Sequence, residues 1–365
     1  MNLERRSAIR LAGGLAAYCS SWGALQTVHG ATDQTSPTPE PIRVGQIGVA
    51  HGHANKLAEY RASTDYDVVG VVEPDPDLRT WAQSQPAFSG VKWLSEQQLL
   101  ETPGLQVVLV ETQVRDLLAT ANRCIAAGKH IHLDKPAGAS LSAFTTLLQQ
   151  AEQQQLLVQM GYMYRYNPAV LLLHELLEQN ALGEIFEIQA VMSKVVDQES
   201  RAKLAGISGG MMFELGCHLI DLVVGLLGEP LRSTPYAQHA STQSDDTLND
   251  NMLAVLEYPR AIATVKTSAM EVEGFARRHL TVCGSGGTFH IQPLDAPTGR
   301  LALSEPHASY QRGYQDVAFP KFTRYQADAR DMAQILRGEK QSDFNYFHDL
   351  AVQKTVLQAA GMPLA

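Results

Sequence analysis

Strand-like and helix-like segments alternate along the first half of the chain, and this alternation restricts the fold more than any other feature. Short apolar runs bounded by turn residues predict strands, and the longer amphipathic stretches between them predict helices. Such alternation is typical of a doubly wound parallel sheet covered by helices. The predicted strands are 42–48, 67–72, 106–110, 130–134 and 156–161, and the clearest covering helices are 117–127 and 141–153.

The second half of the chain has a different pattern. After Pro168 an apolar stretch predicts a helix over 169–180, and Gly183 is typical of a residue that follows a helix end. The later strand-like runs are closely spaced and joined by short turns, as in an antiparallel sheet. They lie at 184–194, 251–257, 261–268, 278–283 and 287–292, followed by helices at 325–337 and 348–360. The segments 195–208 and 234–250 are expected to be loops.

The first predicted strand enters a turn that resembles a phosphate-binding turn. Gly48 and Ala50 stand where a dinucleotide-binding fingerprint has its first two glycines, and His53 stands at the third. A pyrophosphate bound there lies against the amino end of the next helix. Glu73 ends the second strand, twenty-five positions after Gly48, where it can bind ribose hydroxyls. His51 and His53 either contact phosphate or substrate or are exposed turn residues.

The segment GKHIHLDKPAG, residues 128–138, places a lysine at the end of a strand. Pro136 cannot donate a hydrogen bond to a neighbouring strand, so the strand is expected to stop before it. Lys135 then stands at the carboxyl edge of the sheet, where open α/β sheets bind ligands. A lysine there can stabilise negative charge on a substrate oxygen. The alternative is an ordinary surface lysine.

The segment GGMMFELGCHLID, residues 209–221, holds three polar side chains in an apolar stretch. On a helix, the spacing of Glu214, His218 and Asp221 places them on one face. A carboxylate beside an imidazole is a common way to hold a general base near neutral pH. The alternative is a structural pair that only satisfies its own hydrogen bonds.

Together these segments resemble the Gfo/Idh/MocA family, which includes glucose–fructose oxidoreductase and inositol dehydrogenase. The resemblance covers about residues 42–360 and is carried by VGQIGVAHGHA, VVGVVEPD, GKHIHLDKP, GYMYRYNP and GGMMFELGCHLID. It implies an α/β protein with an N-terminal Rossmann domain and a C-terminal α/β domain that has a large, mostly antiparallel open sheet. The expected boundaries are 42–160 for the NAD(P)-binding domain, 161–345 for the substrate and oligomerisation domain, and 346–365 for a terminal helix that packs back on the first domain.

The resemblance also implies roles for individual residues. Lys135, Glu214 and His218 fall on the family's catalytic trio, and Tyr164 and Asp221 fall on positions for substrate. The residues expected to bind the cofactor are Gly48, Ala50, His51, His53, Glu73, Glu111, Lys135 and Arg165.

This sequence departs from the family's pattern at three places. His53 replaces the third glycine, Glu111-Thr112-Gln113 replaces the usual Thr-Pro, and Glu214 replaces the usual aspartate. The first two bear on how the cofactor binds, whereas the third keeps a carboxylate.

The expected cofactor is NAD, with NADP as the alternative. The Glu73 carboxylate would repel a 2′-phosphate, while Arg79, six residues later, would favour one. No Cys-x2-Cys or His-Glu-x2-His pattern occurs, so we expect no metal.

The amino-terminal residues predict export. Arg5-Arg6 precede a loosely apolar stretch with small residues before Ala31, which predicts a twin-arginine signal over 1–31 and a periplasmic or otherwise exported protein. Residues 32–41 are rich in Pro, Ser and Thr and predict a linker. The alternatives are a membrane anchor, a loose terminal helix, or lipidation at Cys19. Glycines and serines interrupt the apolar run, so we expect no stable membrane span in the mature protein.

The expected reaction is oxidation of a secondary alcohol in a sugar, polyol or cyclitol, with a tightly held cofactor. His218 would take the hydroxyl proton, Lys135 would stabilise the oxygen, and Glu214 would orient His218. The alternatives are cleavage or epimerisation of a glycoside through a transient keto sugar, without net redox change, and a non-catalytic binding protein. A net charge of −9 argues against nucleic acid as a partner. The resemblance implies a homo-oligomer, a dimer or tetramer.

Overall fold

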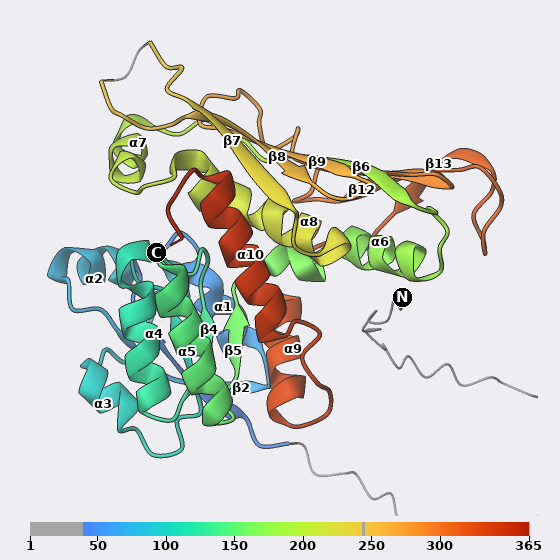
Figure 1. The fold of residues 1–365 in the computed structure, drawn as a ribbon. Coiled ribbons are helices and arrows are strands. Elements are labelled where there is room, and N and C mark those ends of the chain that lie inside the picture. The colour runs from blue at the N-terminus through green and yellow to red at the C-terminus, as the bar shows by residue number, and fades with distance from the viewer. Residues whose placement is uncertain (1–38, 243–244, 365) are drawn as a thin grey trace, which may run out of the picture.

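The computed structural model describes residues 39–242 and 245–364 of the chain and contains two sheets. Figure 1 shows the first sheet with its helices in the lower part of the molecule and a broad second sheet above it. The predicted signal, residues 1–31, and most of the predicted linker lie outside the described residues.

The first domain is a five-stranded parallel sheet with the order β2-β1-β3-β4-β5. Its central strands are buried because helices lie on both faces: α4 and α5 pack on one, and α1 and α9 on the other. The strands are β1 (Ile42–Ile47), β2 (Tyr66–Val72), β3 (Val107–Val110), β4 (His130–Leu133) and β5 (Val158–Met160). The helical segments are η1 (Ala54–Lys56), α1 (Leu57–Ala62), α2 (Pro76–Gln83), η2 (Pro86–Phe88), α3 (Glu96–Leu100), η3 (Val114–Asp116), α4 (Leu117–Ala126), α5 (Leu141–Gln153) and α9 (Gln326–Leu336).

Local sequence explains where several of these helices begin. Asp75 accepts hydrogen bonds from the first backbone N–H groups of α2, and Pro76 occupies the first helical position. Ser95 and Gln98 form a reciprocal capping box at α3. Ser140 caps α5. These caps fix the helices against the sheet whose carboxyl edge carries the candidate site.

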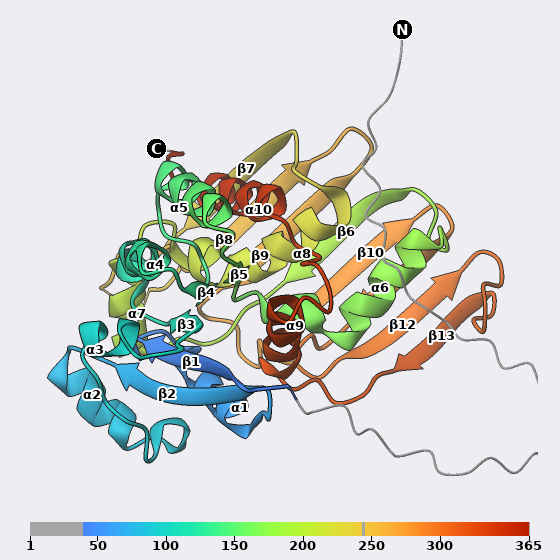
Figure 2. The ribbon, with the colours of Figure 1, turned by 90° about the horizontal axis from the view of Figure 1, so that it is seen from below.

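The second domain is an eight-stranded sheet with the order β13-β12-β11-β10-β6-β9-β8-β7. All neighbouring strands are antiparallel except β6 and β9. Figure 2 shows α6, α8 and α10 across one face of this sheet. The strands are β6 (Ile185–Val191), β7 (Arg232–Gln238), β8 (Asn251–Glu257), β9 (Ile262–Ser268), β10 (His279–Gly284), β11 (Gly287–Ile291), β12 (Thr298–Leu303) and β13 (Gly313–Ala318). The helical segments are η4 (Met163–Tyr166), α6 (Pro168–Glu178), α7 (Gln198–Ala205), η5 (Met212–Gly216), α8 (Cys217–Leu227) and α10 (Tyr346–Ala359).

The fold class predicted from the sequence is confirmed, and the loop predictions are partly wrong. The segment 234–250 contains most of β7, and the segment 195–208 contains α7. β7 is an edge strand of mostly exposed residues that includes Pro235, so it lacks the apolar alternation of a central strand. α7 is polar, with Arg201 as its one buried residue, so it has no apolar stripe to reveal it.

Helix α10 joins the two domains, because it packs against α5 of the first and α8 of the second. Gln353 on α10 donates to the carbonyl of Gly138 and accepts from the backbone of Ala137, just after the predicted lysine motif. In the part of the chain that the structure describes, none of the helices is both long and apolar enough to cross a membrane.

Candidate active site

The turn after β1 brings backbone segments very close together. Gly48 has a φ of +93°, and a Cβ at this position would lie 2.6 Å from the backbone nitrogen of Thr112. Its N–H donates to the carbonyl of Val72 at 2.8 Å, and the N–H of Val49 donates to the Glu73 carboxylate at 3.0 Å. Glycine is therefore required at position 48, as the fingerprint predicts.

The same turn offers free hydrogen-bond donors. Among the described residues, the backbone N–H groups of Ala50 and Gly52 have no partner, whereas those of His51 and Ala54 bond to carbonyls. Apart from its two neighbours in the chain, no residue has an atom within 4 Å of the position that a Cβ on Gly52 would take. Unpaired N–H groups before a helix favour an anion. The turn thus fits a pyrophosphate although Ala50 replaces the second glycine.

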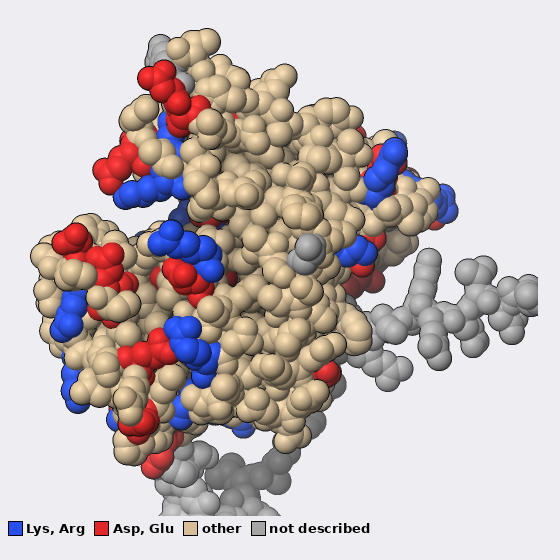
Figure 3. Space-filling model, turned by 60° about the vertical axis from the view of Figure 1, so that its left-hand side comes forward, with Lys and Arg blue, Asp and Glu red and all other residues tan. Residues whose placement is uncertain are grey.

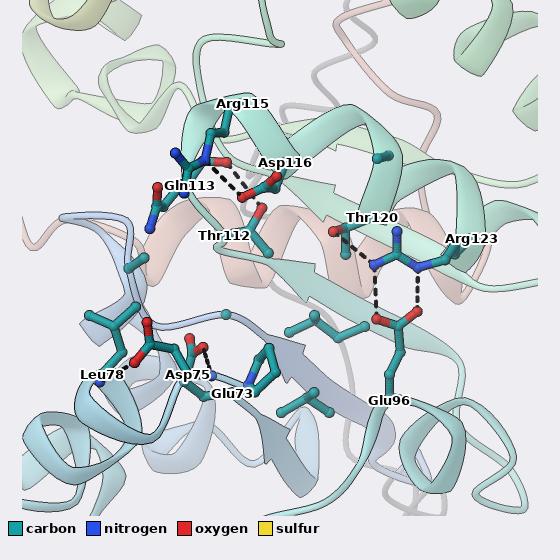
Figure 4. Close-up of a pocket in the computed structure, with 16 residues that line it drawn as sticks. Glu73, Asp75, Leu78, Glu96, Thr112, Gln113, Arg115, Asp116, Thr120 and Arg123 are labelled. Atoms are coloured by element: carbon teal, nitrogen blue, oxygen red, sulfur yellow. Dashed lines mark hydrogen bonds and ion pairs between the residues drawn. The ribbon is translucent and has the colours of Figure 1, made fainter. Parts of the chain in front are cut away.

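A cavity of about 330 Å³ lies beside this turn, at the carboxyl ends of β1, β2 and β3. Figure 4 shows Glu73 and Asp75 on one side of it and Gln113 and Arg115 on the other. This edge of an open α/β sheet is where nucleotides bind. The cavity is also lined by Gly48 and Ala50, so the turn and the cavity form one site.

Glu73 has acceptor capacity left for a ligand. Its Oε1 accepts from the N–H of Asp75 and its Oε2 from the N–H of Val49, both at 3.0 Å. A carboxylate offers about four acceptor positions, so about two remain for ribose hydroxyls. The structure places Glu73 where the ribose prediction needs it, and the contact itself stays a prediction.

Below the turn, a buried lysine lies between two carboxylates. Lys56 Nζ lies 2.8 Å from Glu111 Oε1 and 2.9 Å from Asp134 Oδ2, and all three side chains are inaccessible to solvent. Burial and the neighbouring Asp134 raise the pKa of Glu111 well above its usual range. Burial alone would also raise the pKa of Asp134, but His51 and Lys56 hold it well below its usual range. The shared environment therefore favours ionisation of Asp134 over ionisation of Glu111.

His51 and His53 both face Asp134. Their Nδ1 atoms lie 3.2 Å from Asp134 Oδ2 and Oδ1, respectively. The ring of His53 also lies 5.5 Å from that of His218 and 5.7 Å from that of Tyr325, between centroids. Its side chain is thus bound beside the predicted catalytic residues and does not line the nucleotide cavity. This explains how the turn accommodates a histidine at the third glycine position.

His51, His53 and Asp134 also form the one trio of potential metal ligands found among the described residues. Both oxygens of Asp134 already accept hydrogen bonds, including one from the N–H of Lys135 at 2.6 Å and one from Lys56 at 2.9 Å. Lys56 also supplies the positive charge that a metal would bring. The trio is therefore explained as a hydrogen-bond network, and the absence of a metal stays a prediction.

Lys135 connects the two domains at the centre of the site. β4 ends at Leu133, before Pro136, as the sequence predicts. Lys135 Nζ donates to the carbonyl of Glu214 at 2.8 Å and to its Oε1 at 3.1 Å. Burial alone would lower the pKa of Lys135, but the Glu214 carboxylate raises it above its usual range. Lys135 is therefore a fixed positive charge.

The expected hydrogen bond between Glu214 and His218 does not form. The segment Met212–Gly216 is a π-helix, and α8 begins only at Cys217, so the regular α-helical spacing assumed for these residues does not apply. Glu214 is bound to Lys135 instead. The role of Glu214 in orienting His218 is therefore not supported, although π-helical turns are frequent at functional sites.

His218 is a buried neutral imidazole. Its ring lies 5.3 Å from Tyr164 and 6.0 Å from Tyr162, between centroids, and its Nδ1 has no hydrogen-bond partner among the described atoms. Burial, followed by the charge of Lys135, lowers the pKa of His218 well below 6.5. His218 is therefore in its proton-accepting form at neutral pH.

The pKa of His218 predicts a flat pH profile. Because the neutral form persists well below pH 6.5, kcat/KM should stay level from pH 8 to pH 6, and a descending limb with a pKa near 6.5 would contradict the assignment.

Burial also lowers the pKa of His53 to about 3. Since both folded-state pKa values are depressed, these histidines contribute stability that is present above pH 6.5 and is lost as the pH falls below it. Urea unfolding between pH 8 and pH 4 would measure this loss, and His53→Phe should make it smaller.

Arg165 and Asp221, predicted to bind cofactor and substrate, are bound to each other. Arg165 Nη2 lies 2.6 Å from Asp221 Oδ1 and 2.7 Å from Asp349 Oδ1, and all three side chains are buried. This network ties α10 to α8 and η4. The geometry gives both residues a supporting function, and their predicted ligand contacts stay untested.

The sequence analysis missed the central position of Lys56. One signal was present, because Lys56 follows His53 by three residues, which is the spacing of one helical turn. Its partners Glu111 and Asp134 are far away in the sequence and meet it only because β3 and β4 are neighbours.

Two family models match the chain. Residues 42–162 match the "Oxidoreductase family, NAD-binding Rossmann fold" model, and residues 170–290 match the "GFO/IDH/MocA C-terminal domain" model. Together they span more than half of the chain. The first of them confirms the predicted nicotinamide dinucleotide cofactor at the level of the family.

Among similar proteins, the trans-1,2-dihydrobenzene-1,2-diol dehydrogenase of Sus scrofa is 26% identical over 58% of this chain. The chain covers 62% of that relative's length. The scyllo-inositol 2-dehydrogenase (NADP(+)) of Bacillus subtilis is 25% identical over 49% of this chain and 52% of its own length. A dehydrogenase from Chromobacterium violaceum, solved in complex with NADH and UDP-GlcNAcA, has a TM-score of 0.74 at 16% identity and covers 88% of this chain and 93% of its own. That likeness supports the fold alone. With both domains matched, the chain belongs to the Gfo/Idh/MocA oxidoreductase family.

Proposed function

We propose that this protein is an exported, NAD-dependent oxidoreductase that acts on a secondary alcohol of a sugar, polyol or cyclitol. The observation that carries the proposal is the position of Lys135 and His218. Both lie beside the turn at residues 48–53, one as a fixed cation and the other as a neutral imidazole. The names of two relatives indicate ring diols or cyclitols as their substrates, which supports an alcohol on a ring.

Each residue of the site has a separate role in alcohol oxidation. When bound, the nicotinamide ring supplies the hydride acceptor. His218 accepts the hydroxyl proton, and Lys135 stabilises the negative charge that develops on the oxygen. Glu214 holds Lys135 in place through two hydrogen bonds. Glu73, with the free N–H groups of Ala50 and Gly52, would hold the dinucleotide.

The first test measures cofactor and hydride transfer together. Purified folded protein is denatured, and the released nucleotide is identified by mass and absorbance. The NAD-loaded protein is then mixed with a panel of cyclitols and sugars, and formation of reduced nicotinamide is followed at 340 nm. Reduction by at least one secondary alcohol supports the proposal. A protein that neither carries nor binds NAD or NADP would refute it and favour a binding protein.

Cofactor preference gives a second prediction. Glu73→Gln should weaken NAD binding roughly 10-fold to 100-fold, since one charge-assisted hydrogen bond to the ribose is lost. It should also raise the affinity for NADP relative to NAD, because the repulsive charge is removed. Titration of the apoprotein by fluorescence measures both constants. The control is Glu101→Gln, because Glu101 is exposed and bonds only to Gln97. An unchanged NAD affinity in Glu73→Gln would remove the ribose assignment.

A second candidate function is redox-neutral cleavage or epimerisation of a glycoside through a transient keto sugar. Glu214 favours it, because Glu214 is not bound to His218 and its Oε2 has no partner among the described atoms. The carboxylate of Glu214 can then accept a proton from the C–H group next to the carbonyl of the keto sugar. Product analysis separates the two functions. A ketone that accumulates with reduced nicotinamide indicates net oxidation, and a cleaved glycoside with oxidised cofactor indicates the neutral reaction.

The proposed export rests on Arg5-Arg6 and the apolar stretch that follows them. Fractionation of cells that express the full chain tests it. The protein should leave the cytoplasm, and replacing both arginines by lysine should retain it there. An unchanged distribution would argue against the twin-arginine route.

A further inference from the structure

Lys194 lies next to the proposed active site, since the carbonyl of the preceding residue, Ser193, accepts a hydrogen bond from Arg278 Nε at 3.4 Å. In β6 and its extension, Ile188, Ala190 and Met192 are buried toward the helices, and the alternation places Lys194 on the same face. Its backbone N–H donates to the carbonyl of Ser268 at 3.0 Å, so strand pairing continues to this residue. Among the described residues, the side chain of Lys194 has no hydrogen bond or ion pair.

The charges nearest to Lys194 already have other partners or repel it. Burial lowers its pKa; Glu214 and Asp197 oppose this effect, whereas Arg278 and Lys135 add to it. Glu214 is paired with Lys135 at 3.1 Å, and Asp197 caps α7. Lys194 is therefore a half-buried cation beside two other cations.

Arg324 is a second cation of the site, and its positive charge is only partly neutralised by a carboxylate. Arg324 shares a single carboxylate, Asp295, with Arg278, whose Nη1 lies 2.9 Å from Asp295 Oδ2. Tyr164 donates to the same carboxylate at 2.5 Å, and its ring lies 5.3 Å from that of His218. The side chain of Arg324 remains 33% exposed, against 4% for Arg278. Arg324 is therefore the one of the two that a ligand at His218 can reach.

Among the described residues, this side of the site holds four cations and three carboxylates. The cations are Lys135, Lys194, Arg278 and Arg324, and the carboxylates are Glu214, Asp295 and Asp197, of which Asp197 already accepts a hydrogen bond at the start of α7. The carboxylates of the adjacent cluster, Glu111 and Asp134, are already paired with Lys56. Unpaired charge in a partly buried site is unfavourable, and a bound anion relieves it. Figure 3 shows a hollow between the two domains, with charged side chains of both signs on its rims.

We propose that the substrate carries a carboxylate, which Lys194 binds with Arg324, while its reacting hydroxyl lies at His218. This inference rests on the proposed function and narrows it from neutral sugars and polyols to acidic ones, such as uronates and their glycosides. Lys194 would then determine specificity without taking part in the chemical step.

The test uses matched pairs of probes on the NAD-loaded protein. Each pair consists of a methyl hexopyranoside and the corresponding methyl hexopyranosiduronate in the gluco, galacto or manno configuration. By calorimetry, the carboxylated member of at least one pair should bind roughly 10-fold to 100-fold more tightly than its neutral partner. Lys194→Met should abolish this advantage and leave the melting temperature of the unliganded protein no lower, since the side chain has no partner to lose. Lys203→Met is the control, because Lys203 is exposed on α7 and pairs with Glu199 at 2.7 Å.

Three outcomes would overturn the inference: equal affinities within every pair, an advantage that survives Lys194→Met, or no binding by any carboxylated probe to protein that holds NAD. Failure to hold a nicotinamide dinucleotide would refute the proposed function instead. Since NAD loading is measured before any probe is added, the two failures are distinguishable.

Discussion

Lys135→Met should lower kcat/KM roughly 100-fold to 1,000-fold while the protein keeps its fold and its NAD. The magnitude is that of losing one fixed group that stabilises developing charge on a substrate oxygen. Methionine fills a similar volume without the charge. The Glu214 carboxylate that loses its partner is 25% exposed, so water can replace the ammonium group and the fold should survive. Steady-state kinetics, NAD content and the melting temperature measure the three quantities.

Lys129→Met is the matched control for this substitution. Lys129 precedes the same strand, β4, and its Nζ donates only to the carbonyl of Leu105 at 3.0 Å. Its loss should leave kcat/KM within about twofold, since Lys129 lies at the opposite end of the strand from the site. A Lys135→Met variant with unchanged kcat/KM would remove Lys135 from the catalytic assignment. A variant that loses NAD together with activity would make Lys135 a cofactor-binding residue.

The first domain could be predicted from the sequence because its signals are local. Apolar runs such as 107–110 are buried on both faces, and the glycine at position 48 and the proline at position 136 mark where strands end. The edge strand β7 could not be predicted, because edge strands need little apolar character and β7 has almost none. Local sequence patterns therefore predict buried strands, but they do not identify exposed edge strands.

The candidate site could be predicted in part. The positions of Lys135 and Glu73 follow from where their strands end, which the sequence indicates. The pairing of Glu214 with Lys135 does not, because a π-helix changes the spacing and the partner comes from the other domain. The excess charge at Lys194 was also hidden, since its neighbours come from the residue before β10, from η5 and from the segment that follows β4. Sequence spacing alone could not bring these residues together.

Lys56→Met should lower the free energy of unfolding by about 3–5 kcal/mol, the typical effect of removing one partner from a buried ion pair. Lys56 is wholly buried between Glu111 and Asp134, so its loss leaves the ionised Asp134 without its nearest cation. Glu111→Gln should have a much smaller effect, because glutamine keeps the size of the side chain and burial, together with Asp134, already disfavours the ionised form of Glu111. The double variant Lys56→Met/Asp134→Asn should recover part of the lost stability, since it removes both charges. Urea unfolding of the nucleotide-free proteins measures the free energy of unfolding of the wild type and of these three variants. Lys203→Met is the surface control.

The pH dependence of the same variants distinguishes loss of charge from loss of packing. In the wild-type protein the folded-state pKa of Asp134 is depressed, so its contribution to stability is present above the unfolded pKa of about 3.9 and is lost below it. Without Lys56 the folded-state pKa of Asp134 should be less depressed, because His51 and His53 still lower it, and the variant should lose less stability than the wild type as the pH falls below about 3.9. The difference between wild type and Lys56→Met should therefore be smaller at pH 3 than at pH 8. An equal difference at both pH values would mean that Lys56 acts through packing, and the turn that carries His51 and His53 would then be held by shape instead of charge.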